Sequence, residues 1–384
     1  MTVAPGVTYK SDWIQWRSTF NLERGSEARH PLSRALSRPA LFSYSGKHAE
    51  CLRKNQMIIL AGDIGATKTH LGLYRAAGGG LTRMHDHIYP TQDFPSLEAV
   101  LSDFIKDHEQ IAAACLGVPG PVIGHFAHPT NIGWEIHEKS LSTVLHGATT
   151  RLVNDLAATA YGMLHLEPSQ IVELHKGEEL HQAANIAVIA AGTGLGEAGV
   201  IAAPSGWIAV ASEGGHCDFA PRGAEQVALL QFLEREFGHA SYERAVSGPG
   251  LHNLYRFLVE YLPQPEPEWL KQRMAAGDAS AIISEVALSG QDPRCVHALE
   301  LFTDIYGAEA ANLALKFLAF GGLYIGGGIA PKILPFLQRD SFMRSFLNKG
   351  RLSAVLERMP VRISLNEEAA LLGAAHLAAS MTAS

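Results

Sequence analysis

The sequence predicts an α/β protein with two similar halves, and two stretches carry this prediction. Residues 57–60 form a short apolar run that predicts a buried strand, and a glycine-containing turn at 62–67 leads into an alternating strand pattern. Residues 186–196 repeat the same order of apolar strand, Gly-Thr turn and returning strand. Such a repetition indicates an internal structural duplication.

Both turns have the composition of a phosphate-binding turn. The glycines Gly62 and Gly65 allow backbone N–H groups to approach an anion, and Asp63 would lie beside a phosphate and its metal. Considered alone, the first turn is explained equally well as an ordinary hairpin turn with a solvated acid. The second turn favours the phosphate interpretation, because two such turns predict two halves that face one nucleotide.

Local patterns predict the elements of the first half. Runs at 69–75 and 81–89 flank a tip of alanine and glycine, so they predict an antiparallel hairpin that extends the first strand into a three-stranded meander. Ser96 precedes apolar residues at helical spacing and predicts a capped helix over 97–105. The other predicted elements are a buried strand at 111–118, a polar turn at 128–131, a short helix near 138–145, a strand at 151–155 and a helix at 156–164.

The second half begins after a crossover at 167–169, and strands at 186–190, 197–203 and 206–211 predict a second meander. Asp292 and Pro293 predict the start of a long helix that runs to about residue 320. The other predicted elements are helices at 224–237 and 251–261, a rigid connection at 263–267, a strand at 321–325, a glycine turn at 326–328 that leads into a helix, a strand at 361–365 and a closing helix at 367–379.

Composition predicts a soluble, cytoplasmic globular protein. The 384 residues suffice for two domains, and 47% of them are hydrophobic and 18% charged. No apolar run approaches the roughly 20 residues of a membrane span, so no membrane partner is expected. The four cysteines are scattered singly without a CxxC pair, which predicts reduced thiols and no zinc site: Cys51, Cys115, Cys217 and Cys295.

The formal net charge of −7 is unevenly distributed. Residues 1–56 hold 9 Lys and Arg against 4 Asp and Glu, or +5, which leaves −12 for the remainder. The acidic remainder has no basic stripe, so nucleic acid is not an expected partner. The extension lacks a signal-peptide h-region and is interpreted as a disordered basic tail, a transit segment weakened by its acids, or sequence upstream of a start at Met57. We favour the tail or the upstream start, because Met57 opens the first strand directly.

Asn154 and Asp155 lie where a predicted strand meets a predicted helix. Asn and Asp are preferred helix N-caps, so either residue could have no function other than capping the helix. A carboxylate at the mouth of an α/β cleft is also well placed to accept a proton from a bound hydroxyl group. The two interpretations do not exclude each other.

A second polar cluster occupies residues 212–219, where Glu213, His216 and Asp218 surround two glycines. A metal site is one hypothesis, but the spacing does not match a helical metal pair and no cysteine lies at a ligand spacing. Hydrogen bonding to a polyhydroxylated ligand fits better, since Glu accepts and His donates or accepts. A satisfied polar loop is the remaining interpretation.

Six stretches occur in an order that resembles the bacterial glucokinases of the hexokinase type: GDIGATKT, LVNDLAATA, GTGLG, SEGGH, ERAVSGPG and GGGIAP. The resemblance covers the chain from about Met57 to near its C-terminus. It implies the actin-like ATPase (ribonuclease H-like) fold, in which two domains with five-stranded mixed sheets flank a cleft. The small domain would comprise 57–166 and 366–384, and the large domain 167–365.

The resemblance also implies the reaction, which is ATP-dependent phosphorylation of D-glucose at its 6-hydroxyl group, with Mg²⁺. Asp155 matches the catalytic base, and the sugar-binding residues match Asn154, Asp155, Glu213, His216 and Glu243. Asp63 would hold Mg²⁺ through water, and a homodimer is expected. The residues that match the nucleotide-binding loops are Gly62, Asp63, Gly65, Thr67, Gly192, Thr193, Gly194, Gly196, Gly327 and Gly328.

One residue departs from the family pattern, and several alternative functions stay open. Ala66 stands where a second glycine is usual, so the geometry of the first phosphate turn could differ. The zinc-binding cysteine cluster of the related repressor and sugar-kinase family is absent from the sequence. Within the enzyme class, the alternatives are another hexose as substrate and polyphosphate as phosphoryl donor. A sugar-responsive regulator is a third alternative, but residues 1–56 lack the paired helical pattern of a DNA-binding motif. An actin-like polymer or ATPase is a fourth, but it would not need the polar clusters at 154–155 and 213–216.

Overall fold

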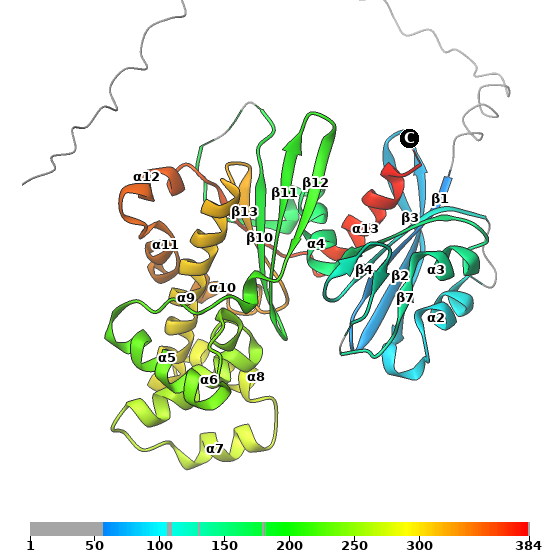
Figure 1. The fold of residues 1–384 in the computed structure, drawn as a ribbon. Coiled ribbons are helices and arrows are strands. Elements are labelled where there is room, and N and C mark those ends of the chain that lie inside the picture. The colour runs from blue at the N-terminus through cyan, green and yellow to red at the C-terminus, as the bar shows by residue number, and fades with distance from the viewer. Residues whose placement is uncertain (1–56, 106–109, 130, 179, 181, 383–384) are drawn as a thin grey trace, which may run out of the picture. The chain divides into compact units, whose positions relative to one another are not determined.

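The computed structural model describes residues 57–105, 110–129, 131–178, 180 and 182–382 (Figure 1). The predicted extension at 1–56 lies outside the described residues. Two mixed sheets form the framework of the described part, and a small three-stranded sheet accompanies the first of them. Among the described helices, none combines the length and apolar character that a membrane crossing requires.

The first sheet has the strand order β3-β2-β1-β4-β8. Its first three strands form the predicted antiparallel meander, and β4 and β8 run parallel to β1. Alternate side chains of β1 reach opposite faces, as the pleat requires: Leu60 joins one apolar cluster and Ile59 the other. The strands are β1 Met57–Ile64, β2 Lys68–Ala77, β3 Gly80–Pro90, β4 Ile111–Val118 and β8 Thr149–Asn154.

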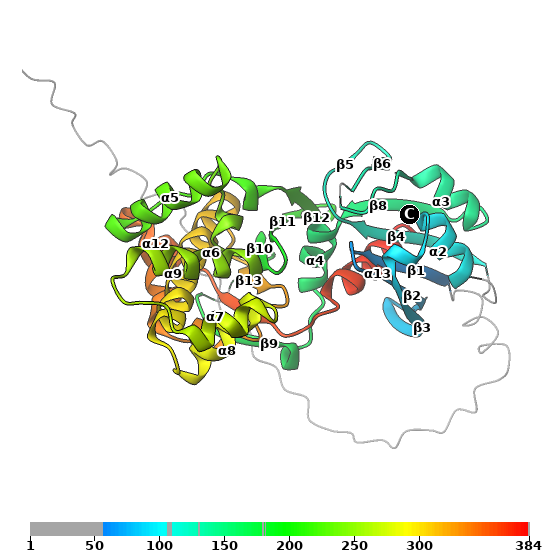
Figure 2. The ribbon, with the colours of Figure 1, turned by 90° about the horizontal axis from the view of Figure 1, so that it is seen from below.

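Helices from both ends of the chain cover this sheet. On one face lie α2 (Leu97–Phe104), which Ser96 caps as predicted, and α3 (Glu138–Val144). On the other face lies α13 (Ala369–Ser380), which Figures 1 and 2 show in red against the blue strands. The final helix therefore completes the sheet with which the described chain begins. The small sheet consists of β5 Val122–Ile123, β6 Phe126–Ala127 and β7 Ile136–His137.

The second sheet has six strands rather than the predicted five, in the order β12-β11-β10-β13-β14-β9. The additional strand, β9, pairs antiparallel with β14 at the edge of the sheet. Its five residues do not alternate cleanly between apolar and polar, so it forms through this pairing rather than through a strong local pattern. The strands are β9 Ile171–His175, β10 Ile186–Ala191, β11 Leu195–Ala203, β12 Gly206–Ser212, β13 Gly322–Gly326 and β14 Val361–Ser364.

A large apolar core joins the second sheet to its helices, with α9 as the buried helix that the sequence predicts. Asp292 caps α9 by accepting hydrogen bonds from the N–H groups of Arg294 and Cys295. The predicted helix after 326–328 is reduced to the four residues of α10, and no pattern noted above predicts α7 or α8. The helices are α5 Gly223–Phe237, α6 Gly248–Tyr261, α7 Glu268–Ala275, α8 Ala279–Ser289, α9 Pro293–Phe317, α10 Leu334–Leu337, α11 Asp340–Leu347 and α12 Ser353–Leu356.

The helix α4 (Asp155–Met163) connects the two sheets through side-chain packing. Its Ala160 and Met163 belong to an apolar cluster that includes Val188 of β10. Its other contact is with α13, where glycines allow the two backbones to touch. A Cβ atom added to Gly162 would lie 2.0 Å from the carbonyl oxygen of Ala369, and one added to Gly373 would lie 1.8 Å from that of Ala158. Neither position accepts a side chain without movement of a helix.

Candidate active site

One pocket of about 580 Å³ gathers most of the predicted site residues, a volume within the range of sites for small ligands. It is lined by residues that follow strands of both sheets. The predicted residues that line it are Asp63, Asn154, Asp155, Gly192, Thr193, Gly194, Gly196, Glu213, His216, Glu243, Gly327 and Gly328. Gly62, Gly65 and Thr67 are absent from this lining, whereas Lys68, which was not among the predicted residues, is part of it.

Asp155 is the first residue of α4, and its neighbour Asn154 caps the helix. The Asn154 side chain accepts a hydrogen bond from the N–H group of Ala157 at 3.1 Å, so the cap does not use Asp155. The Asp155 carboxylate accepts the N–H group of Leu156 at 2.8 Å and faces the pocket. Asn154 therefore provides the cap, and the Asp155 side chain is left facing the pocket.

The pKa of Asp155 is raised to about 7. Burial is the main cause, because it disfavours the charged carboxylate, and the hydrogen bond from Leu156 partly opposes it. The negative charges of Asp63 and Glu213 raise the pKa further. A carboxylate with a pKa near neutral pH is a stronger proton acceptor than an ordinary aspartate.

Asp63 lies near the end of β1 and lines the same pocket. Burial raises its pKa, while the charges of His70 and Lys68 oppose the rise. The turn after β1 is closed by a hydrogen bond from the Gly65 N–H group to the Lys68 carbonyl oxygen at 2.9 Å. Gly62 instead has a packing role, since an added Cβ would lie 2.4 Å from the Leu116 side chain.

The segment 213–216, which contains the 3-10 helix Gly214–His216, presents Glu213 and His216 to the pocket. Its two glycines are required by close contacts rather than by unusual dihedral angles. A Cβ added to Gly215 would lie 1.9 Å from the Leu195 carbonyl oxygen, so this segment rests directly on the second glycine turn. Glu213 and His216 also line a small cavity with His128 and Asn131, two residues that were not among the predicted site residues.

Glu243 lines the pocket and is hydrogen-bonded to the second glycine turn. It lies in the 3-10 helix Tyr242–Arg244, and its carboxylate accepts the N–H group of Leu195 at 2.9 Å. The turn itself is tight, because the Gly192 N–H group donates to the Gly194 carbonyl oxygen at 2.8 Å. Glu243 therefore contacts both the pocket and the backbone of the turn, which its predicted role in sugar binding did not include.

A second cavity, of about 760 Å³, adjoins the pocket and shares Gly192, Thr193, Gly328 and Lys332 with it. Ile329 and Ile333 form part of its wall, as do Gly248 and Pro249 at the start of α6. Gly327 has a φ of +80°, and an added Cβ would lie 2.3 Å from the carbonyl oxygen of Ala191, so this position requires glycine.

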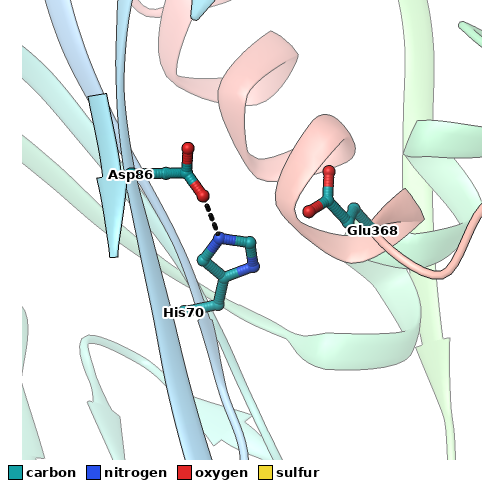
Figure 3. A group of neighbouring side chains, drawn as sticks. All are labelled: His70, Asp86 and Glu368. Atoms are coloured by element: carbon teal, nitrogen blue, oxygen red, sulfur yellow. Dashed lines mark hydrogen bonds and ion pairs between the residues drawn. The ribbon is translucent and has the colours of Figure 1, made fainter. Parts of the chain in front are cut away.

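Among the described residues, one group of potential metal ligands lies close together, and it is outside residues 212–219. The potential ligand atoms of His70, Asp86 and Glu368 lie within 4.8 Å of one another. Figure 3 shows these three side chains. Arg83 already pairs with this group, at 2.6 Å from Glu368 and 3.8 Å from Asp86. We interpret the group as an ion network at the start of α13.

Comparison with known proteins identifies the family. The sequence model of the glucokinase family matches residues 60–381. A curated glucokinase from Nostoc sp. (strain PCC 7120) is 39% identical over 343 residues, which cover 84% of this chain and 99% of that protein. The crystal structure of a glucokinase from an Antarctic psychrotroph is 31% identical, has a TM-score of 0.74, and covers 84% of this chain and 99% of its own.

A glucokinase structure from Balamuthia mandrillaris shares the fold at 22% identity, with a TM-score of 0.70 and coverage of 87% of this chain and 99% of its own. The actin-like ATPase fold and the family resemblance predicted from the six motifs are thereby confirmed. The chain belongs to the glucokinase family, and it is an enzyme of glucose phosphorylation.

Proposed function

We propose that the protein transfers the γ-phosphoryl group of ATP to the 6-hydroxyl group of D-glucose, with Asp155 as the general base. The observation that carries this proposal is the position of Asp155, whose carboxylate faces a pocket lined by both the 213–216 segment and the second glycine turn. Phosphoryl transfer depends mainly on positioning and charge stabilisation, which such a pocket supplies. Asp155 orients the hydroxyl group and accepts its proton as the new bond to phosphorus forms.

The sugar is held by side chains that can exchange hydrogen bonds with several hydroxyl groups. Glu213 and Glu243 accept, Asn154 donates and accepts, and His216 does either according to its tautomer. The polar ends of these side chains line one pocket with Asp155, which supports a polyhydroxylated substrate over an apolar one. In the same way, the clusters at 154–155 and 213–216 favour a sugar kinase over a bare ATPase.

The phosphates of ATP would lie between the turn after β1 and the turn at 192–196, and its nucleoside in the adjoining cavity beside Gly328. Lys68 contributes a positive charge on the phosphate side. Asp63 fits Mg²⁺, a cation that binds through one or two carboxylates and retained waters. When bound, Mg²⁺ supplies charge neutralisation at the β- and γ-phosphates.

We propose that the two sheets and their helices are the two predicted domains, 57–166 with 366–384 and 167–365, and that they close on the sugar. Closure would exclude water and suppress hydrolysis of ATP. The α4 helix, which packs against elements of both, would transmit the movement. A scattering profile that is unchanged by glucose would contradict closure. A cytoplasmic homodimer remains our expectation, and sedimentation at several concentrations measures it.

The proposed reaction is tested by glucose-dependent release of ADP. With ATP and Mg²⁺ we expect ADP formation only when glucose is added, together with glucose 6-phosphate in equal amount. A panel of fructose, mannose and glucosamine measures the specificity for the sugar, and polyphosphate in place of ATP measures the specificity for the donor. ADP release at an equal rate without any sugar would contradict the proposal.

The raised pKa of Asp155 predicts how the reaction depends on pH. Its base form dominates above a pKa of about 7, so kcat/KM for glucose should fall as pH is lowered through 7, approaching tenfold per pH unit below it. An ordinary aspartate would keep the activity nearly constant down to pH 5. Initial rates between pH 5.5 and 8.5 at constant ionic strength measure the profile. A flat profile across this range would exclude Asp155 as a base with a raised pKa.

Glu243 should affect the binding of both substrates. Replacing it by alanine leaves the Leu195 N–H group without its acceptor, and an unmet hydrogen bond costs about 1–3 kcal/mol, or about 5- to 150-fold in binding. We expect KM to rise for glucose and for ATP in Glu243→Ala, and less in Glu243→Gln, whose amide oxygen can still accept. Glu234→Ala, at an exposed position of α5, is the matched control. A rise for glucose alone would show that the contact with the turn is dispensable.

A further inference from the structure

A second buried carboxyl group, outside the pocket, lies beneath the 213–216 segment. Glu197 belongs to β11 and stands opposite Ser212 of β12, the last residue before Glu213. Only 1% of Glu197 is exposed to solvent. Among the described residues, no group donates a hydrogen bond to either of its carboxyl oxygens. Burial of an ionised carboxylate in this way is unfavourable, so the group requires an explanation.

The Glu197 carboxyl group touches the backbone of the sugar-binding segment directly. A Cβ added to Gly214 would lie 2.0 Å from Glu197 Oε2 and 3.0 Å from Ser212 Oγ. The Gly214 N–H group donates to the same Ser212 hydroxyl at 2.9 Å. The first turn of the 213–216 segment is thus seated on Glu197 and Ser212, and a displacement of the Glu197 carboxyl group would move it.

A second acid, Glu309 of α9, lies beside Glu197 and is also 1% exposed. Unlike Glu197, it has donors: Asn312 Nδ2 at 2.7 Å and Lys316 Nζ at 3.4 Å. Two adjacent buried carboxyl groups are stable when they share a proton, and the group without donors is the one that retains it. The pKa of Glu197 is accordingly raised, first by burial and then by the charge of Glu309.

The same network reaches the segment that carries Glu243. Asn312 Nδ2 also donates to the hydroxyl group of Tyr242 at 3.2 Å, and Lys349 Nζ donates to Asn312 Oδ1 at 2.5 Å. The acid pair therefore lies between the two segments that present the sugar-binding side chains. The titratable and charged groups that surround Glu197 and Glu309 in this network are Lys316 and Tyr306 of α9, Tyr242 of the 3-10 helix, Lys349 and Arg222.

We propose that Glu197 is a positioning residue for the sugar: in its protonated form it bridges Glu309 and the Gly214 backbone, and so holds Glu213 and His216 in the binding geometry. This inference rests on the proposed function, because it assigns a support to the same sugar site. Loss of the proton places two negative charges side by side in a buried space. The 213–216 segment then shifts, and the sugar is bound more weakly while the chemistry at Asp155 is unchanged.

The test compares KM for glucose at pH 7 and pH 9 in the wild-type enzyme and in Glu197→Gln. The protonated form of Glu197 is depleted as pH rises through its raised pKa, so KM should rise severalfold between pH 7 and pH 9 in the wild type, with kcat changed much less. Glutamine is always neutral and has the same shape. The Glu197→Gln variant should therefore match the wild type within about twofold at pH 7 and keep that KM at pH 9.

Two further variants define the interpretation. Glu309→Gln should also lose the alkaline rise in KM, because an amide donor can then satisfy an ionised Glu197. Glu173→Gln, an exposed position on β9, is the matched control and should keep the rise. If Glu197→Gln does not fold, calorimetric binding of glucose to Glu309→Gln and to the wild type at both pH values provides the same comparison.

The outcomes separate this inference from the proposed reaction. A wild-type enzyme that phosphorylates glucose with the same KM at pH 7 and pH 9 would overturn the role of Glu197 and leave the reaction intact. So would a Glu197→Gln variant that keeps the full alkaline rise. Failure to bind or phosphorylate glucose at either pH would instead contradict the proposed function itself.

Discussion

Replacement of Asp155 by asparagine is expected to lower kcat about 10²- to 10⁴-fold, the contribution that a general base typically makes. Asparagine has the shape of aspartate, and its amide oxygen can still accept the Leu156 N–H group that Asp155 accepts at 2.8 Å. It cannot take up the proton of the sugar hydroxyl group. The helix cap is preserved as well, because Asn154 provides it.

The measurement that distinguishes a base from a structural residue is the separation of binding from turnover. Calorimetry should show that Asp155→Asn still binds glucose, while the rate of ADP release falls to near the background. Asp93→Asn, at an exposed position that does not line the pocket, is the matched control and should keep full activity. An Asp155→Asn variant with near wild-type kcat would require another residue to accept the proton.

The substitution Gly373→Ala, which adds a single methyl group, is expected to have the second largest effect. It should lower the stability of the protein and, as a consequence, its activity. Alanine there would place its Cβ 1.8 Å from the carbonyl oxygen of Ala158, so α13 and α4 must move apart. Overpacking of this kind typically costs about 1–3 kcal/mol, and here the obstacle is backbone, which cannot rotate away. Because Asp155 is the first residue of α4, movement of that helix also displaces the proposed base, and kcat should fall with the stability.

Urea unfolding at pH 7, followed by fluorescence, measures the loss of stability as a lower midpoint. Gly80→Ala is the matched control: it lies at the start of β3, an added Cβ would be 3.7 Å from its nearest neighbour, and its midpoint should change little. Gly162→Ala, on the other side of the same contact, should resemble Gly373→Ala. An unchanged midpoint in both helix variants would mean that α4 and α13 are farther apart in solution.

Local sequence patterns were sufficient for the elements that depend on local interactions. The meander of β1 to β3, the Ser96 cap, strand β4 and the start of α9 at Pro293 agree with prediction because alternation and capping are properties of neighbouring residues. The position of Asn154 and Asp155 at a strand end also followed from sequence. Only the structure shows that Asn154 caps the helix while the Asp155 side chain faces the pocket.

The features that sequence did not predict depend on residues far apart in the chain. Strand β9 exists through its pairing with β14, almost 200 residues later, and the pocket brings Lys68 together with Gly192 and Gly327, which lie more than 100 residues away in the sequence. The roles of Gly214 and Glu197 depend on a contact between strand β11 and the 213–216 segment. A sequence pattern records the spacing of residues along the chain, and it contains no information on which backbone atoms a glycine allows to touch.

The position of α13 has a consequence for how the protein folds during synthesis. Ile59 of β1 and Leu371 of α13 share one apolar cluster although 312 positions separate them (371 − 59). This face of the first sheet therefore lacks its α13 cover until more than 300 further residues have been synthesised after β1. During that interval the apolar face of these strands is open to aggregation or to a chaperone.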